Sequence, residues 1–377
     1  MKITNKKLIS KFVDTIKSIS KKDKIAIFHD TDPDGITSAA LIKKSVEKLN
    51  LNVVYVNWLD RSNNEHDNKI IKELKQLGVN YVFFGDLTFY QIEGRIENFA
   101  QLGTIIVFDH HPFEKDLNSE KIIFILPNLF QEGISPSRYN TSKLVYDFFS
   151  RVIDLSEHDW ICAVGIIADY AFDAWPEYLD MCFKKYGDER KPNMYDTKLG
   201  NLAKLLSYGN SIGREYLVEG YKALLVAKSP DEMKLHLPTE FHKVGDDINK
   251  IVGHYKRDAD IDEDLELVFY KIDSKYGVAS QVSSALSQNY EPKKTVIIIQ
   301  EIENDPYIHV SARRQDWKVD CGKLMRESCT GIPNAHGGGH IPAAGAGVPD
   351  EHFAEFETNL FNNLKSGKYK RDGKGKN

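Results

Sequence analysis

Three aspartates, Asp30, Asp32 and Asp34, lie within five residues, between a short apolar run and a stretch of helical periodicity. Carboxylates this close repel one another, and a fold tolerates the crowding best where cations neutralise it. In open α/β sheets, the loop that joins a strand to the next helix lies at the carboxyl edge, where ligands bind. The acidic turn therefore predicts an α/β sheet with a cation site at that edge.

The first 130 residues alternate β-rich runs with polar or helical segments. The runs are dense in Ile, Val, Phe and Tyr, and they cover 24–29, 53–57, 81–84, 104–108 and 122–126. Alternation of strands and helices is typical of a parallel sheet with helices on both faces.

From about residue 141 to 255 the pattern is helical, and strand character returns at 265–272. We predict a parallel-sheet domain at 1–255, whose helical part covers about 141–255. A smaller α/β domain at 265–365 follows, with a cleft between the two, and a frayed basic tail at 366–377 ends the chain.

Charge and composition argue against several classes of protein. Fifty Lys and Arg against 55 Asp and Glu give a net charge of −5, which disfavours a duplex binder with a broad basic surface. The apolar runs are far shorter than the roughly 18 residues of a membrane span. The N-terminus lacks the features of a signal peptide, and the four cysteines show no CxxC spacing. We expect a cytoplasmic protein without a membrane partner.

Further charged residues follow the next strands. Asp86 comes after the third run, Asp109, His110 and His111 come after the fourth, and Asp169 ends an apolar helix. Oxygen ligands with one or two imidazoles suit Mn²⁺ or Mg²⁺. The number of ligands indicates two ions about 3.5–4 Å apart that share a bridging carboxylate, as in enzymes that hydrolyse phosphoesters.

The second domain offers groups that bind anions. Arg313 and Arg314 end a predicted strand, and a forked guanidinium binds phosphate through two hydrogen bonds. The run 336–340 (HGGGH) is expected to form a glycine-rich turn whose N–H groups cradle an anion. The alternative for this run is a flexible turn without a ligand.

Each motif also has a simpler interpretation. A calcium loop that begins at Asp30 requires Glu at its twelfth position, where Leu41 stands. The acidic turn could instead be a solvated helix cap. A serine esterase is suggested by 209–213 (GNSIG) together with 336–339 (HGGG), but the order is reversed, and a helix precedes Ser211 where a strand is required.

The sequence resembles the DHH phosphoesterase superfamily in its DHH–DHHA1 arrangement. The motifs that carry the resemblance are HDTDPDGITSAALI (29–42), GDLT (85–88), FDHHPF (108–113), GIIADY (165–170), SARR (311–314) and GGGHIPAAGAG (337–347). The resemblance implies a catalytic domain that binds two Mn²⁺ ions, or Mg²⁺, and a DHHA1 domain that holds the phosphate and sugar of the substrate.

The resemblance also implies roles for single residues. Asp30 and Asp32 would serve one ion, Asp34, His110 and Asp169 the other, and Asp86 would bridge them. Asp109 would orient His110, and His111 would face the scissile phosphate. The residues that would bind the substrate in the second domain are Arg313, Arg314, Gly338, Gly339 and His340.

The sequence departs from the family pattern in two places. Several relatives have a metal-binding histidine where this chain has Phe28, and Asp30 is expected to substitute for it. Arg314 stands where many relatives have a small polar residue.

Three functions are compatible with these motifs. The first is an Mn²⁺-dependent phosphodiesterase or exonuclease of single-stranded RNA or DNA, and the acidic balance favours short oligonucleotides. The second is a phosphatase for polyphosphate, a nucleoside bisphosphate or a cyclic dinucleotide. The third is a catalytically inactive binding subunit, with replication or repair proteins as partners.

Overall fold

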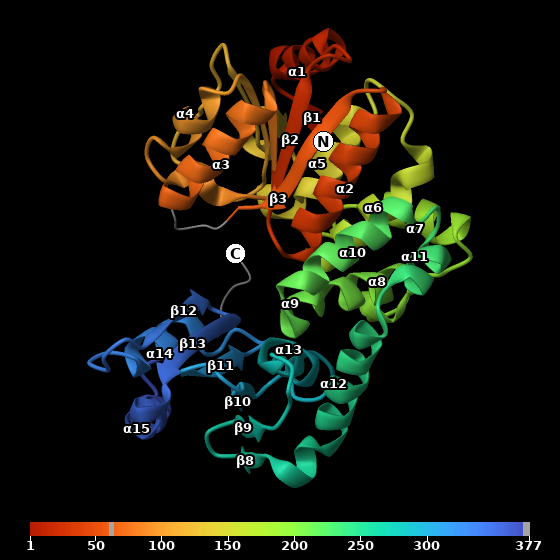
Figure 1. Ribbon diagram of the computed structural model, residues 1–377. Coiled ribbons are helices and arrows are strands. Elements are labelled where there is room, and N and C mark those ends of the chain that lie inside the picture. The colour runs from red at the N-terminus through yellow and green to blue at the C-terminus, as the bar shows by residue number, and fades with distance from the viewer. Residues whose placement is uncertain (60–63, 372–377) are drawn as a thin grey trace. The chain divides into compact units, whose positions relative to one another are not determined.

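The computed structural model describes residues 1–59 and 64–371, and the chain divides into two compact units, Met1–Pro238 and Thr239–Asn377 (Figure 1). The division precedes the domain boundary expected near residue 255. The reason is that the long helix α12 (Thr239–Asp258) packs against α13 (Ala279–Asn289) and β9 (Leu267–Ile272) of the second unit.

The first unit is built on a parallel five-stranded sheet, as predicted, and its strand order is β3-β2-β4-β5-β6. The strands are β2 (Lys24–His29), β3 (Asn52–Trp58), β4 (Tyr81–Gly85), β5 (Thr104–Phe108) and β6 (Ile122–Ile125). Runs of β-branched and aromatic residues form these strands because the sheet is covered on both faces, so that both sets of side chains are buried.

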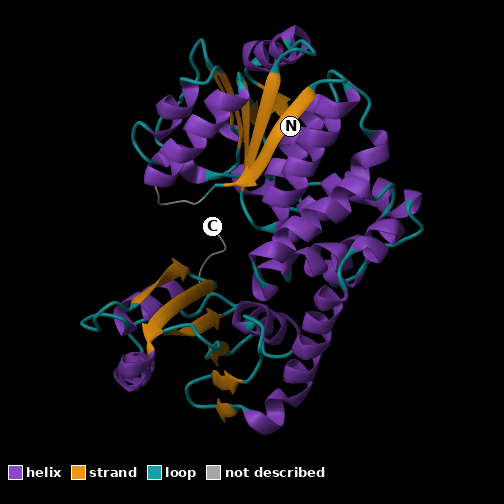
Figure 2. Ribbon diagram, viewed as in Figure 1, coloured by secondary structure: helices purple, strands orange, loops and turns teal. Residues whose placement is uncertain are grey.

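Helices lie on both sides of this sheet (Figure 2). On one side α2 contacts β2 and β4, and α5 contacts β5. On the other side α3 and α4 bury Leu74 and Phe99 against Phe28 and Phe84. The elements are α1 (Lys6–Ser18), α2 (Pro33–Lys48), α3 (Asn64–Leu77), α4 (Arg95–Ala100) and α5 (Thr141–Phe149), with a small sheet of β1 (Lys2–Ile3) and β7 (Gln131–Glu132).

The remaining part of the first unit is helical, and its helix α6 packs against α2, α5 and α8. Its helices are α6 (Asp159–Ala168), α7 (Pro176–Lys185), α8 (Lys198–Ser207), α9 (Gly209–Ile212), α10 (Arg214–Val226) and α11 (Pro230–His236). Ser211 lies in the short helix after α8, which agrees with the exclusion of an esterase nucleophile. Among the described residues, none of the helices combines the length and apolarity that crossing a membrane requires.

The second unit contains a six-stranded mixed sheet of order β12-β13-β11-β10-β9-β8. Only β9 and β10 pair in parallel; the other neighbours are antiparallel. Helix α13 contacts β10 and β11, whereas α14 and α15 bury the other face. The elements not yet given are β8 (Asp260–Asp262), β10 (Thr295–Gln300), β11 (Tyr307–Arg313), α14 (Cys321–Ser328), β12 (His336–His340), β13 (Ala343–Pro349) and α15 (Phe353–Ser366).

The glycine-rich run is the edge strand β12, and the prediction of a turn is wrong. The cause is close packing of α14 on this strand. A Cβ atom at Gly337 would lie 2.5 Å from the carbonyl oxygen of Met325 in α14. Glycine is required here because the helix backbone occupies the space of a side chain.

The described part of the C-terminal tail is packed, so the expectation of a frayed tail is wrong for it. Tyr369 is buried and donates its hydroxyl to Glu327, and the amide of Arg371 donates to the carbonyl oxygen of Lys318 at 2.7 Å. The remaining residues of the expected tail, 372–377, lie outside the described residues.

Two neighbouring glycines of β12 should respond differently to alanine. We expect Gly337→Ala to lower the free energy of unfolding by about 1–3 kcal/mol, because its methyl group would overlap the backbone of α14. At Gly338 the nearest atom to a new Cβ is Nη2 of Arg326 at 4.0 Å, so Gly338→Ala should stay within about 0.5 kcal/mol of the unsubstituted protein. Urea denaturation followed by circular dichroism measures both, and equal losses would contradict the packing argument.

Candidate metal centre

The ends of three adjacent strands are aligned, and this alignment gathers the acidic residues. His29 of β2, Gly85 of β4 and Phe108 of β5 lie side by side in register. The residues that follow are held by backbone hydrogen bonds, from the amide of Asp30 to Gly85 at 3.3 Å and from the amide of Asp86 to Phe108 at 2.9 Å. The residues that follow these strands therefore emerge together at the carboxyl edge of the sheet, the edge where ligands bind in open α/β sheets.

One group of possible ligands comprises Asp34, His110 and Asp169, with one ligand atom of each within 4.8 Å of the others. Nδ1 of His110 lies 3.7 Å from Oδ2 of Asp169. Both atoms are buried, and within the described residues neither has a hydrogen-bond partner. Buried polar atoms are nearly always satisfied, so this pair indicates a site for a cation.

A second group, within the same 4.8 Å limit, contains Asp86, Asp109, His110 and His111. Oδ1 of Asp86 lies 3.5 Å from Nε2 of His110 and 3.8 Å from Nδ1 of His111. Asp86 has a φ of 62°, in the left-handed region, and its carboxylate accepts a hydrogen bond from the hydroxyl of Thr141 at 2.8 Å. His110 thus belongs to both groups, and Asp86 lies beside it.

Asp109 is fully buried and is surrounded by donors. Its Oδ1 accepts from Nδ1 of His111 at 2.7 Å and from the amide of His110 at 2.7 Å, and its Oδ2 accepts from the hydroxyl of Tyr90 at 2.7 Å. Asp109 therefore orients the ring of His111, whereas the resemblance implied that it would orient the ring of His110. The hydrogen bond from His111 favours the ionised carboxylate.

Asp34 is held by the N-terminus of α5, a contact that the sequence analysis missed. Its carboxylate accepts from the amides of Thr141 at 2.8 Å and Ser142 at 3.0 Å, from the Ser142 hydroxyl at 2.6 Å and from the Asn140 side chain at 2.7 Å. The Asn-Thr-Ser sequence before an apolar helix is a signal for a helix start, but it does not reveal which carboxylate will bind there.

Asp30 and Asp32 lie in the same loop, and the side chain of Asp32 also interacts with that of Asp86. Asp32 caps α2 by accepting from the amide of Gly35 at 2.8 Å, and Asp30 accepts from the amide of Thr31 at 2.6 Å. Neither belongs to the two groups of ligand atoms found among the described residues. Their role as ligands of a second ion therefore stays a prediction.

Burial and like charges perturb the carboxylates of this cluster. Desolvation, followed by the charges of Asp32 and Asp34, raises the pKa of Asp86 well above its usual value. Desolvation and the charge of Asp34 raise the pKa of Asp169 to about 9. Burial by itself would raise the pKa of Asp109, but the hydrogen bonds from His111 and Tyr90 and the charges of the two histidines together lower it. A divalent cation would relieve this repulsion, and the oxygen and imidazole donors fit Mn²⁺ or Mg²⁺.

Arg314 is not available to a substrate, contrary to the prediction. Its side chain is buried and lies 2.5 Å from the carboxylate of Glu266 and 2.7 Å from that of Asp316. Its remaining donors reach the carbonyl oxygen of Glu266 and the hydroxyl of Thr295. All five N–H groups of the guanidinium thus have acceptors within the protein.

Arg313 has a different environment. Its guanidinium donates to the hydroxyls of Ser280 at 2.8 Å and Ser284 at 3.4 Å, and to the carbonyl oxygens of Ala312 and Ala344. None of these acceptors carries a formal charge. Gly338, Gly339 and His340 lie in the edge strand β12 of the same sheet, in which β11 carries Arg313.

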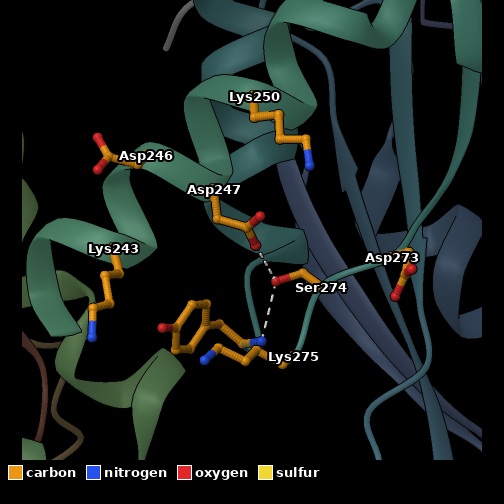
Figure 3. Close-up of a pocket in the computed structure, with 8 residues that line it drawn as sticks. Lys243, Asp246, Asp247, Lys250, Asp273, Ser274 and Lys275 are labelled. Carbon is orange, nitrogen blue, oxygen red and sulfur yellow. Dashed lines mark hydrogen bonds between the residues drawn. The ribbon is translucent and has the colours of Figure 1, made fainter.

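A pocket in the second unit has a mixed lining (Figure 3). Ser274 donates its hydroxyl to Asp247 at 2.5 Å and accepts from the amide of Tyr276 at 3.1 Å. The other lining residues are three lysines and two further aspartates, Lys243, Lys250, Lys275, Asp246 and Asp273. Positive and negative charges are equal in number, so the lining does not favour a ligand of either sign.

Comparison with protein families identifies both units. The N-terminal domain of the DHH family matches residues 24–172, and the DHHA1 domain matches residues 265–366. No curated protein sequence matches the chain.

Solved structures with the same fold cover nearly the whole chain. An exonuclease RecJ bound to manganese has a TM-score of 0.66 at 14% identity, over 97% of this chain and 95% of that protein. An exopolyphosphatase-related protein from Bacteroides fragilis has a TM-score of 0.54 at 14% identity, over 97% and 98%. CDC45 from Entamoeba histolytica has a TM-score of 0.53 at 11% identity, over 96% and 98%. At these identities the similarity establishes the fold.

Neutralising one ligand should weaken metal binding. We expect Asp169→Asn to lower the affinity for Mn²⁺ by at least about tenfold, because the amide keeps the shape of the carboxylate but loses its charge. Isothermal titration calorimetry of the full chain measures this. Asp180→Asn in α7 is the matched control, since Asp180 forms an exposed ion pair with Arg190 at 3.0 Å. Equal affinities in the two variants would contradict the assignment of the site.

Proposed function

The chain belongs to the DHH–DHHA1 superfamily, and we propose that it is an Mn²⁺-dependent phosphodiesterase of single-stranded nucleic acid or short oligonucleotides. One observation carries the proposal: the buried atoms Nδ1 of His110 and Oδ2 of Asp169 have no hydrogen-bond partner within the described residues and lie 3.7 Å apart. A cation between these atoms would satisfy both.

We assign Asp34, His110 and Asp169 to one ion, and Asp30 and Asp32 to a second, with Asp86 shared. Divalent ions held there would polarise a phosphoryl oxygen and ease the deprotonation of a water molecule. The chain itself orients the ligands: the N-terminus of α5 fixes Asp34, and the hydroxyl of Thr141 fixes Asp86.

His111 is assigned to protonate the leaving oxygen. Its Nδ1 is held by Asp109, which is fixed in turn by Tyr90, so the orientation of the ring is set by two successive hydrogen bonds. The side chain of His111 is 34% exposed, whereas that of His110 is 9% exposed, which fits contact with a substrate for the first and with an ion for the second.

Arg313 is assigned to grip a phosphate group of the substrate. Ser280 and Ser284 hold the guanidinium through hydrogen bonds to their hydroxyls, and a guanidinium can bind a phosphate through two hydrogen bonds. In Arg314, two carboxylates compensate the charge.

The same ligands would serve a phosphatase of polyphosphate, a nucleoside bisphosphate or a cyclic dinucleotide, so a substrate panel is the decisive experiment. We expect the full chain with Mn²⁺ to release mononucleotides from labelled RNA or DNA oligonucleotides, and Asp86→Ala to abolish the release. Phosphate release from polyphosphate alone would favour the phosphatase. Absence of turnover on every substrate would contradict both and favour a binding subunit.

The two hydrogen bonds that orient His111 give a graded prediction. We expect His111→Ala to lower kcat by about 100-fold or more, as for the loss of a general acid. Tyr90→Phe should lower kcat by about tenfold, because it removes one hydrogen bond to a charged group and loosens Asp109. Steady-state kinetics on the best substrate of the panel measures both, and an unchanged kcat in His111→Ala would overturn the assignment.

A further inference from the structure

An exposed aromatic side chain directly follows a proposed metal ligand. Tyr170 comes after Asp169 at the end of α6, and it is 41% exposed. At this exposure, part of the surface of the ring is accessible to a ligand. The surrounding contacts show that the ring is held in place.

The backbone of Tyr170 is fixed in an uncommon conformation. Its φ is 54°, which is rare for a bulky side chain, and its amide donates to the carbonyl oxygen of Ile167 at 3.1 Å. Its own carbonyl oxygen accepts a hydrogen bond from the guanidinium of Arg138. Arg138 is anchored in turn, because its carbonyl oxygen accepts from the indole of Trp175 at 2.8 Å.

The ring of Tyr170 is also supported by other aromatic rings. Its centre lies 5.4 Å from that of Tyr195, edge to face, and 6.3 Å from that of Phe172. The hydroxyl of Tyr195 donates to the carbonyl oxygen of Ala168 at 3.1 Å, which ties this support to the end of α6. Tyr170 is therefore a positioned ring with part of its surface open.

We propose that the ring of Tyr170 is a stacking platform for the base of a nucleotide whose phosphate binds at the Asp34, His110 and Asp169 cluster. The inference rests on the proposed function and adds a substrate class to it: compounds with an aromatic base, in preference to inorganic polyphosphate or sugar phosphates. Every base has a π-face, so a single ring accepts all of them.

The net charge of the chain supports a contribution of base stacking to substrate binding. With a net charge of −5, the protein has no broad excess of positive charge to hold a polyanion. Stacking supplies affinity that does not depend on charge. It therefore suits short substrates, which make few phosphate contacts.

The test compares two ligands that differ only in the base. Adenosine 5′-monophosphate and ribose 5-phosphate are titrated calorimetrically into the Mn²⁺-loaded full chain. We expect the unsubstituted protein to bind the nucleotide about tenfold more tightly than the sugar phosphate, which is within the range for one stacked base. Tyr170→Phe should keep this preference, and Tyr170→Leu should lose it while its affinity for ribose 5-phosphate stays unchanged.

Two controls separate stacking from damage to the site. Tyr290→Leu replaces a tyrosine that is 54% exposed in α13's C-terminal turn, and it should leave the preference intact. Tyr170→Asn provides a second variant without the ring, because asparagine tolerates a positive φ. The Mn²⁺ affinity of each variant is measured alongside, and equal weakening of both ligands would overturn the inference.

The experiments distinguish failure of the Tyr170 platform from failure of the proposed phosphodiesterase activity. A preference for the nucleotide that depends on Tyr170 supports the platform even if no oligonucleotide is hydrolysed. Hydrolysis with an unchanged KM in Tyr170→Leu would retain the phosphodiesterase and overturn the platform. The platform is also overturned if the unsubstituted protein binds the two ligands equally or binds neither.

Discussion

Electrostatic repulsion between buried carboxylates is the constraint on which the first unit depends. The register of β2, β4 and β5 aligns His29, Gly85 and Phe108, so the acidic residues after them emerge at one edge. Desolvation and mutual repulsion there raise the pKa of Asp86 and that of Asp169. Such a cluster persists only where donors or cations compensate it.

The protein compensates part of this charge with its own donors. The N-terminus of α5 donates to Asp34, and Tyr90 and His111 donate to Asp109. Oδ2 of Asp169 and Nδ1 of His110 lack such donors among the described residues. The difference between the satisfied and the unsatisfied atoms locates the place where a cation is needed, independently of any similarity to other proteins.

The sheet of the first unit could be predicted from the sequence because dense β-branched runs that alternate with helical segments are typical of a parallel sheet covered on both faces. Asp86 and His110 directly follow two of these strands, which predicted that both lie at the carboxyl edge of the sheet. The partners of these residues could not be predicted, because the contact of Thr141 with Asp86 depends on how α5 packs. Arg313 and Arg314 are adjacent in sequence, and only the structure shows that carboxylates engage the second. The edge strand β12 was missed because glycine gives no strand signal.

Backbone strain at the cluster argues that its geometry is set before any ligand arrives. Among the described residues of the first unit, the non-glycine residues with positive φ are Asn50, Asp86 and Tyr170. Two of these three belong to the edge where the carboxylates meet, and such conformations cost of order 1–3 kcal/mol each. Asp86 is held by the hydrogen bond of its amide to Phe108, and Tyr170 by Arg138. A site whose strain is stored in the fold needs little rearrangement to bind an ion or a substrate.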